Sequence, residues 1–131
     1  MRKLLVVLTF VLLAGCIQIW DEEKKNFEMF SDIPIPEESM MNKRKTAIIG
    51  DSENWWGVLE FSMSNTVPIL FDYYSKEMKR FGWKELTFLK GESSNHSLVF
   101  SRKGRVAQIN FDFHKIEGTL IKITMSPKTE K

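Results

Sequence analysis

The stretch Ser64–Phe81, SNTVPILFDYYSKEMKRF, decides the fold, because its apolar residues recur at the three- and four-residue steps of one helical face. The residues of that face are Val67, Leu70, Phe71, Tyr74, Met78 and Phe81. One of the polar residues 64–66 can cap the start of the helix, and Pro68 fits its first turn. Gly82 follows the last turn as a stop signal. The pattern predicts one amphipathic helix whose apolar face is buried.

Two-residue alternation predicts strands on both sides of this helix. The predicted strands are Trp55–Met63, Trp83–Leu89, Ser97–Ser101, Arg105–Phe113 and Thr119–Met125, with a possible extra strand at Thr46–Ile49. In the first of them, Leu59, Phe61 and Met63 share one face. One polar face per strand is typical of an antiparallel sheet with one side in water. The expected fold class is therefore α+β, with two layers: one helix packed on an antiparallel sheet of about five strands.

Length and charge limit the functions that the chain can have. Its 131 residues, 43% hydrophobic and 27% charged, make one modest domain with short appendages. The 19 basic residues include Arg2 and Lys3, and without these two the chain carries 17 charges of each sign. A neutral chain lacks the basic face that neutralises phosphates. We therefore expect no nucleic-acid partner.

The N-terminus has the layout of a secretory signal peptide over residues 1–15. Arg2 and Lys3 precede the apolar run Leu4–Leu13, and the small residues Ala14 and Gly15 follow it. This run is shorter than the roughly 20 residues that a membrane-spanning helix needs. The segment is therefore predicted to be a cleaved signal peptide.

Leu13-Ala14-Gly15-Cys16 resembles the bacterial lipobox, an aliphatic residue and two small ones before a cysteine. The resemblance implies that Cys16 receives a diacylglycerol by thioether linkage, that the chain is cut before it, and that the new amino group takes a fatty acid such as palmitate. The alternative is an unmodified buried thiol in an ordinary signal peptide or signal anchor. With a single cysteine, an intramolecular disulfide is impossible and a thiolate zinc site is disfavoured.

The expected location is the cell envelope, on a membrane through the lipid on Cys16. Ile17, rather than aspartate, follows the cysteine. In many bacteria with two membranes, lipoproteins of that kind reach the outer membrane, and this implies its periplasmic face.

Residues 16–38 are interpreted as the lipidated N-terminus and a tether, and residues 39–131 as the domain. Prolines at 34 and 36 disfavour helix for the residues before them, so this part should be extended. Trp20, Phe27, Met29 and Phe30 either form a short amphipathic helix on the lipid surface or pack on the edge of the domain.

The mature chain also resembles small, uncharacterised bacterial envelope lipoproteins. The likeness consists of a D-I-P-x-P motif at 32–36, Trp56-Gly57, and Tyr73-Tyr74 followed by Met78 and Gly82-Trp83. The resemblance carries no assigned activity.

The sequence predicts neither an enzyme nor a cofactor. It contains no glycine-rich phosphate loop, serine elbow or Cys-His pair. His96 and His114, the latter beside Asp112, lack the paired spacing of metal ligands, and surface positions are the simpler interpretation. No metal site is therefore predicted.

Trp55 and Trp56 are adjacent, and neighbouring strand residues point to opposite faces, so one of them can enter the core while the other stays out. Whichever of the two faces the solvent is the leading candidate for contact with a partner. Tyr73 and Trp83, at the margin of the helix, are further candidates. In the simpler interpretation these aromatic side chains only cover the edge of the sheet. The expected function is a non-enzymatic, lipid-anchored module that interacts with another envelope protein, and the alternative is an envelope lipoprotein that binds a small or lipid-like ligand.

Overall fold

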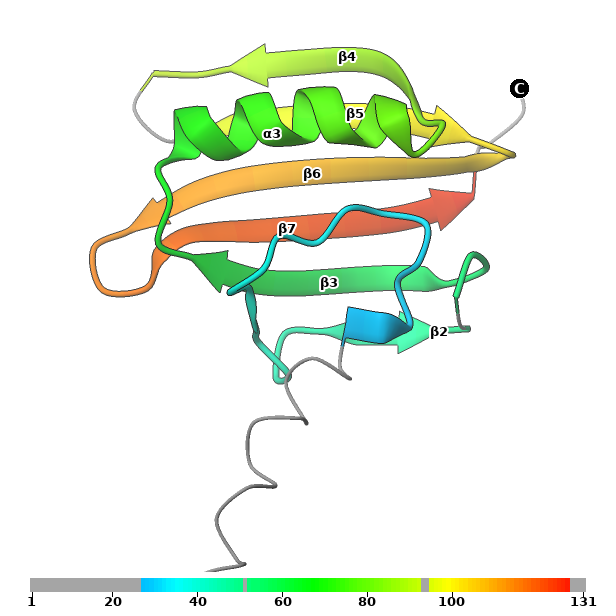
Figure 1. Ribbon diagram of the computed structural model, residues 1–131, viewed down its shortest axis with the longest axis horizontal. Coiled ribbons are helices and arrows are strands. Elements are labelled where there is room, and N and C mark those ends of the chain that lie inside the picture. Colours follow the sequence, from blue (N-terminus) through cyan, green and yellow to red (C-terminus); the bar gives the residue numbers. More distant parts are fainter. Residues whose placement is uncertain (1–26, 51, 93–94, 128–131) are drawn as a thin grey trace, which may run out of the picture.

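The computed structural model describes residues 27–50, 52–92 and 95–127. In these residues the helix α3 packs on one face of an antiparallel seven-stranded sheet (Figure 1). This architecture confirms the α+β class. Among the same residues, no helix is long and apolar enough to cross a membrane.

Helix α3 spans Val67–Arg80, and Gly82 terminates it as the sequence predicts. Gly82 has a φ of +88°, and its backbone N–H donates to the Lys79 carbonyl at 3.1 Å. The Trp83 N–H donates to the Met78 carbonyl at 3.0 Å, which completes a Schellman motif. The predicted apolar face is buried except at Phe81, which is 37% exposed because it lies at the C-cap, where the chain leaves the helix.

The sheet has more strands than the five expected. Its strands are β1 (Met40–Met41), β2 (Ala47–Ile49), β3 (Trp56–Met63), β4 (Lys84–Lys90), β5 (His96–Arg102), β6 (Arg105–His114) and β7 (Gly118–Pro127). The order is β1-β3-β7-β6-β5-β4, and β2 also pairs with β3. Strand β2 occupies the possible extra strand at 46–49, whereas β1 is too short for alternation to reveal it.

The long strands bury the faces that alternation predicts. Leu59 opposes Ile123 and Phe61 opposes Ile121 between β3 and β7, and all four side chains are fully buried. Phe113 alternates with the buried Phe111 on the same face of β6, but it is 53% exposed because it lies near the end of the strand.

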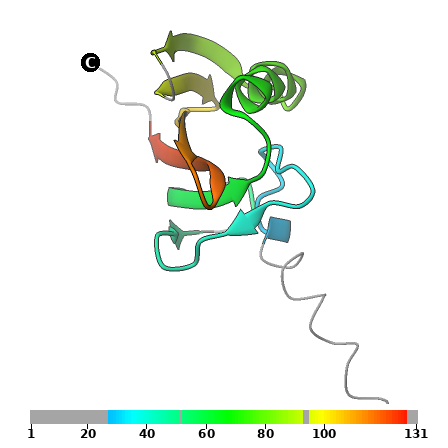
Figure 2. The same ribbon diagram turned by 90° about the vertical axis from the view of Figure 1, so that its left-hand side faces the viewer.

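Two elements cover the apolar face of the sheet. Helix α3 contacts β4, β5 and β6, and the segment Phe27–Ser39 lies on the same side over β7 and β3 (Figures 1 and 2). Phe30 and Ile33 of this segment are 3% and 2% exposed, and the Phe30 ring packs edge-on against Trp55 at 5.0 Å. The segment that we interpreted as the end of a tether is thus part of the core, and the folded domain includes residues before Ser39. The helix alone is too narrow to cover β3 and β7.

Candidate functional site

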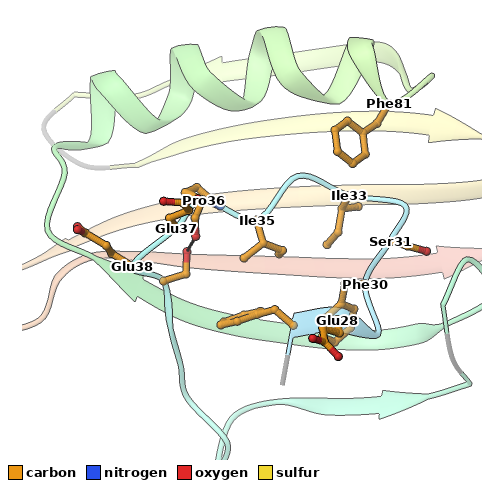
Figure 3. Close-up of a pocket in the computed structure, with 11 residues that line it drawn as sticks. Glu28, Phe30, Ser31, Ile33, Ile35, Pro36, Glu37, Glu38 and Phe81 are labelled. Carbon is orange, nitrogen blue, oxygen red and sulfur yellow. Dashed lines mark hydrogen bonds between the residues drawn. The ribbon is translucent and has the colours of Figure 1, made fainter. Parts of the chain in front are cut away.

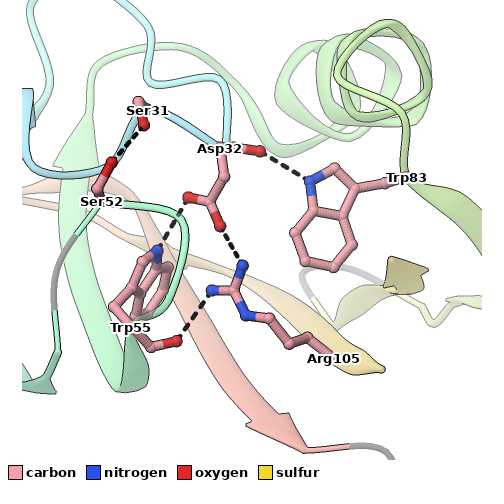
Figure 4. A network of polar contacts seen from close by, with 6 residues as sticks. All are labelled: Ser31, Asp32, Ser52, Trp55, Trp83 and Arg105. Carbon is pink, nitrogen blue, oxygen red and sulfur yellow. Dashed lines mark hydrogen bonds and ion pairs between the residues drawn. The ribbon is translucent and has the colours of Figure 1, made fainter. Parts of the chain in front are cut away.

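Trp55 is part of the core and not of the surface. It is fully buried, and its indole Nε1 donates to Asp32 Oδ1 at 2.9 Å (Figure 4). Trp83 is 2% exposed, and its Nε1 donates to the Asp32 carbonyl oxygen at 2.8 Å. Of the two adjacent tryptophans, Trp55 is therefore the one that enters the core, and neither Trp55 nor Trp83 lies on the surface where a partner could contact it. Each indole N–H needs an acceptor once it is buried, and the extended segment supplies both acceptors.

Arg105 closes this network from the start of β6. Its Nη1 forms an ion pair with Asp32 Oδ2, and its Nη2 donates to the Trp55 carbonyl at 2.9 Å (Figure 4). The guanidinium carbon lies 5.7 to 5.8 Å from the ring centroids of Trp55, Trp56 and Trp83, within the range of cation–π attraction. Asp32 and Arg105 are 1% and 6% exposed. The network joins the N-terminal segment to the sheet, and Asp32, Trp55, Trp83 and Arg105 are all buried in it.

Trp56 and Tyr73 are the predicted partner residues that stay half-buried. Trp56 lies at the start of β3 and covers Arg105. Tyr73 lies on α3, and its ring packs edge-on against Tyr74 at 5.2 Å. Burial, and then the nearby Glu77 carboxylate, raise the pKa of the Tyr73 hydroxyl. These two aromatic residues therefore occupy separate elements, β3 and α3.

A groove of about 770 Å³ lies between the N-terminal segment and the end of α3 (Figure 3). Its apolar lining consists of Phe27, Phe30, Ile33, Ile35, Pro36 and Phe81. Every charged residue in the lining is a carboxylate: Glu28, Glu37 and Glu38. The sequence does not predict this groove, because one of its walls is the segment that we interpreted as a tether. The isoleucines and prolines at 33–36 and the two glutamates after them belong to this lining, but their local sequence does not show that the segment covers the sheet.

The opposite face of the sheet carries a second, polar depression of about 570 Å³. Glu60 of β3 lines it and is only 8% exposed. Its Oε1 accepts from Asn42 Nδ2 at 3.5 Å and lies 3.8 Å from Lys45 Nζ. Lys122 and Asp112 also line it. The lining therefore carries charges of both signs, and Glu60 is already paired within it.

Neither histidine lies in a metal site that the described residues could form. His114 Nδ1 accepts the backbone N–H groups of Ile116 and Glu117, both at 3.4 Å. The His96 ring packs edge-on against Phe71 at 5.5 Å. In the described ranges, no three His, Cys, Asp or Glu side chains come together as ligands. Cys16, the predicted lipidation site, lies outside these ranges.

Comparison of the chain with protein-family models, with curated proteins and with solved structures found no match.

Proposed function

We propose that the protein is a lipid-anchored module of the bacterial cell envelope that binds another envelope protein through the groove. The proposed occupant is a segment of that protein with apolar side chains flanked by lysine or arginine. One observation carries the proposal: the lining is apolar, and its charges are all negative. Electrostatic complementarity of this kind selects partners and orients them.

The lipobox Leu13-Ala14-Gly15-Cys16 supports the anchor. Stable attachment takes two lipid signals, each buried methylene contributing about 0.8 kcal/mol, so a diacylglycerol and an amide-linked acyl chain on Cys16 hold the chain firmly. The neutral mature chain adds no electrostatic attraction to lipid. Because Ile17 follows the cysteine, we place the protein on the periplasmic face of the outer membrane where the source has two membranes.

The position of the groove in the sequence supports a protein partner. Its lining includes the first described residues of the chain, which follow the proposed lipid anchor closely. Only residues 17–26 separate the proposed lipid from Phe27, the first described residue of the lining. An extended chain of ten residues spans at most about 35 Å. The groove therefore stays within that distance of the bilayer surface, where the membrane-proximal segments of other envelope proteins are concentrated.

Two experiments test the two parts of this proposal separately. Labelled fatty acid should enter the full-length chain and not the Cys16→Ser variant, which should leave the membrane fraction in a high-salt wash. Equal labelling of both would exclude the anchor.

For the groove, a photo-crosslinking phenylalanine analogue at Phe81 should capture an envelope protein, and the captured site should be an apolar segment with basic neighbours. The matched control is the same analogue at Ile116, which is 90% exposed and lies far along the chain from the groove residues. Equal capture at both positions would contradict the groove as the binding surface.

The second candidate function, binding of a small or lipid-like ligand, is favoured by the size of the groove. Its volume of about 770 Å³ falls in the range of roughly 300 to 1,000 Å³ that is typical of ligand pockets. A ligand of this kind would have to be neutral or cationic, because the three glutamates repel an anionic headgroup. Mass spectrometry of the intact protein under non-denaturing conditions would reveal a stoichiometric ligand.

A further inference from the structure

Strand β4 forms an open edge of the sheet. Among the described residues it pairs with β5 alone, and it ends the strand order. Leu86, Phe88 and Leu89 of this strand are 49%, 59% and 58% exposed. The other edge is closed by β1 and β2, which are two and three residues long. Short strands protect an edge from further pairing, whereas the seven-residue β4 leaves a longer row of backbone groups open, beside three exposed apolar side chains.

Three side chains of β4, those of Glu85, Phe88 and Lys90, form a row on the helix side of the sheet. Glu85 lies 4.0 Å from Lys79 Nζ and accepts from Ser75 Oγ at 3.5 Å. The Phe88 ring lies 6.4 Å from the ring of Phe71, and Lys90 Nζ lies 4.8 Å from the centroid of that same ring.

Glu85, Phe88 and Lys90 therefore all point toward α3. The register shifts between Glu85 and Thr87, so Leu86 is the extra residue of a bulge. Leu89 points to the other side, where it lines the polar depression. When Leu86 is set aside as the bulge residue, the row on the helix side runs Glu85, Phe88, Lys90. Phe88 is therefore in the middle of the row, and each end carries a charge.

We propose that β4 pairs antiparallel with β4 of a second copy, about a two-fold axis at Phe88. This arrangement places Glu85 of each copy opposite Lys90 of the other, so two ion pairs form across the interface. The two Phe88 rings meet at the axis, and Thr87 lies opposite Leu89 on the other face. The two sheets become one continuous sheet, and opposite charges and paired aromatic rings are the cross-strand neighbours that stabilise such ladders.

Charge complementarity selects this axis over its neighbours. An axis at Thr87 places Phe88 opposite Glu85, and an axis at Leu89 places Phe88 opposite Lys90. Both alternatives place Phe88 opposite a charged side chain and remove the pairing of Glu85 with Lys90 across the interface. A two-fold axis also closes the assembly at two copies, because it uses the same edge of each and leaves the short-stranded edges outside.

The test is disulfide crosslinking of the full-length chain in its membrane, with Phe88→Cys. Directly opposed residues in an antiparallel pair have Cα atoms about 4.5 to 5.5 Å apart, a distance that a disulfide spans. Mild oxidation should therefore give a covalent dimer of this chain. The matched controls are Ile116→Cys, at a 90% exposed turn away from β4, and the unmodified chain with Cys16 alone. Dimer yields no higher than those of the controls, or a disulfide to another protein, would overturn the proposal.

Exchange of the charges at Glu85 and Lys90 tests the register of the proposed β4–β4 pairing independently of folding. In the Phe88→Cys chain, Glu85→Lys and Lys90→Glu alone should each lower the dimer yield about tenfold, because each places like charges opposite one another twice. The double exchange Glu85→Lys/Lys90→Glu should restore it. Yields that do not respond to the single exchanges, or that the double exchange fails to restore, would overturn the two-fold register. Neither residue lines the groove, so this result is independent of partner binding there.

Discussion

Asp32 and Arg105 are 73 positions apart in the chain and form the buried ion pair that attaches the N-terminal segment to the sheet. Each member of the pair also forms a hydrogen bond with Trp55. The Asp32 carboxylate accepts from Trp55 Nε1, and Arg105 Nη2 donates to the Trp55 carbonyl. A paired, hydrogen-bonded geometry is the condition under which two charges tolerate burial. The segment that leads to the proposed lipid anchor is thereby fixed to the domain.

Asp32→Asn should destabilise the protein strongly. The amide keeps the size of the side chain but leaves the buried guanidinium without a counter-charge, which typically costs about 3 to 5 kcal/mol of unfolding free energy. Chemical denaturation followed by tryptophan fluorescence measures the loss. Arg80→Ala is the matched control, since it removes the exposed Glu77–Arg80 pair at 3.0 Å and should cost less than about 1 kcal/mol. Equal losses in the two variants would show that the buried pair does not hold the segment.

The helix and the long strands could be predicted from the sequence because an element that buries one face carries its apolar residues at a regular spacing. The apolar residues of α3 and the alternation in β3, β6 and β7 are each set by a single buried side. Strand β4 shows the limit of this reasoning. Its residues alternate like those of a half-buried strand, but as an edge strand most of them are exposed.

The network around Asp32 could not be predicted, because the contacts that bury it join distant segments. A proline-spaced extended segment has no period, and nothing in its local sequence shows that it covers a sheet. The pairing of two tryptophan N–H groups and one arginine with the same aspartate depends on tertiary structure alone. The groove was missed for the same reason, since this segment forms one of its walls.

Gly82→Ala should lower the stability of the protein through backbone strain. A Cβ at this position meets only the Arg102 side chain, at 3.5 Å or more, so steric contact is ordinary. The positive φ of +88° remains, and it costs a residue with a side chain roughly 1 kcal/mol. For a domain of this size the melting temperature should fall by about 4 to 8 °C.

Gly82→Asn provides the control for this strain, because asparagine tolerates the left-handed region better than alanine does. Its melting temperature should lie between those of the native chain and Gly82→Ala. A melting temperature of Gly82→Ala equal to that of the native chain would mean that the Schellman ending does not require glycine.

Tyr74 should make the stability depend on pH in the alkaline range. Complete burial, and then the neighbouring Tyr73, raise the pKa of its hydroxyl well above the usual value of 10.0. Above that usual value the unfolded chain releases this proton while the folded chain keeps it. The unfolding free energy should therefore fall as the pH rises past 10, by about 1.4 kcal/mol per pH unit for this one proton, until the folded hydroxyl ionises as well.

Tyr74→Phe isolates that contribution. The hydroxyl is buried and, among the described residues, has no hydrogen-bond partner, so its removal should cost little stability at pH 7. Denaturation at a series of pH values should show a shallower alkaline loss for Tyr74→Phe than for the native chain. Identical slopes would mean that Tyr74 ionises equally in the folded and unfolded chains.

Partner capture at the groove should depend on its glutamates and not on Trp56. With the photo-crosslinking residue at Phe81, Glu37→Lys/Glu38→Lys should reduce the yield about tenfold or more, equivalent to about 1.4 kcal/mol of binding free energy, because it turns attraction for a basic segment into repulsion. Glu92→Lys/Glu117→Lys is the matched control: it changes the net charge equally at exposed positions outside the lining and should leave the yield unchanged. Trp56→Ala should also leave it unchanged, because Trp56 is not in the lining. A yield that falls with Trp56→Ala and survives the reversal of Glu37 and Glu38 would move the binding surface from the groove to the start of β3.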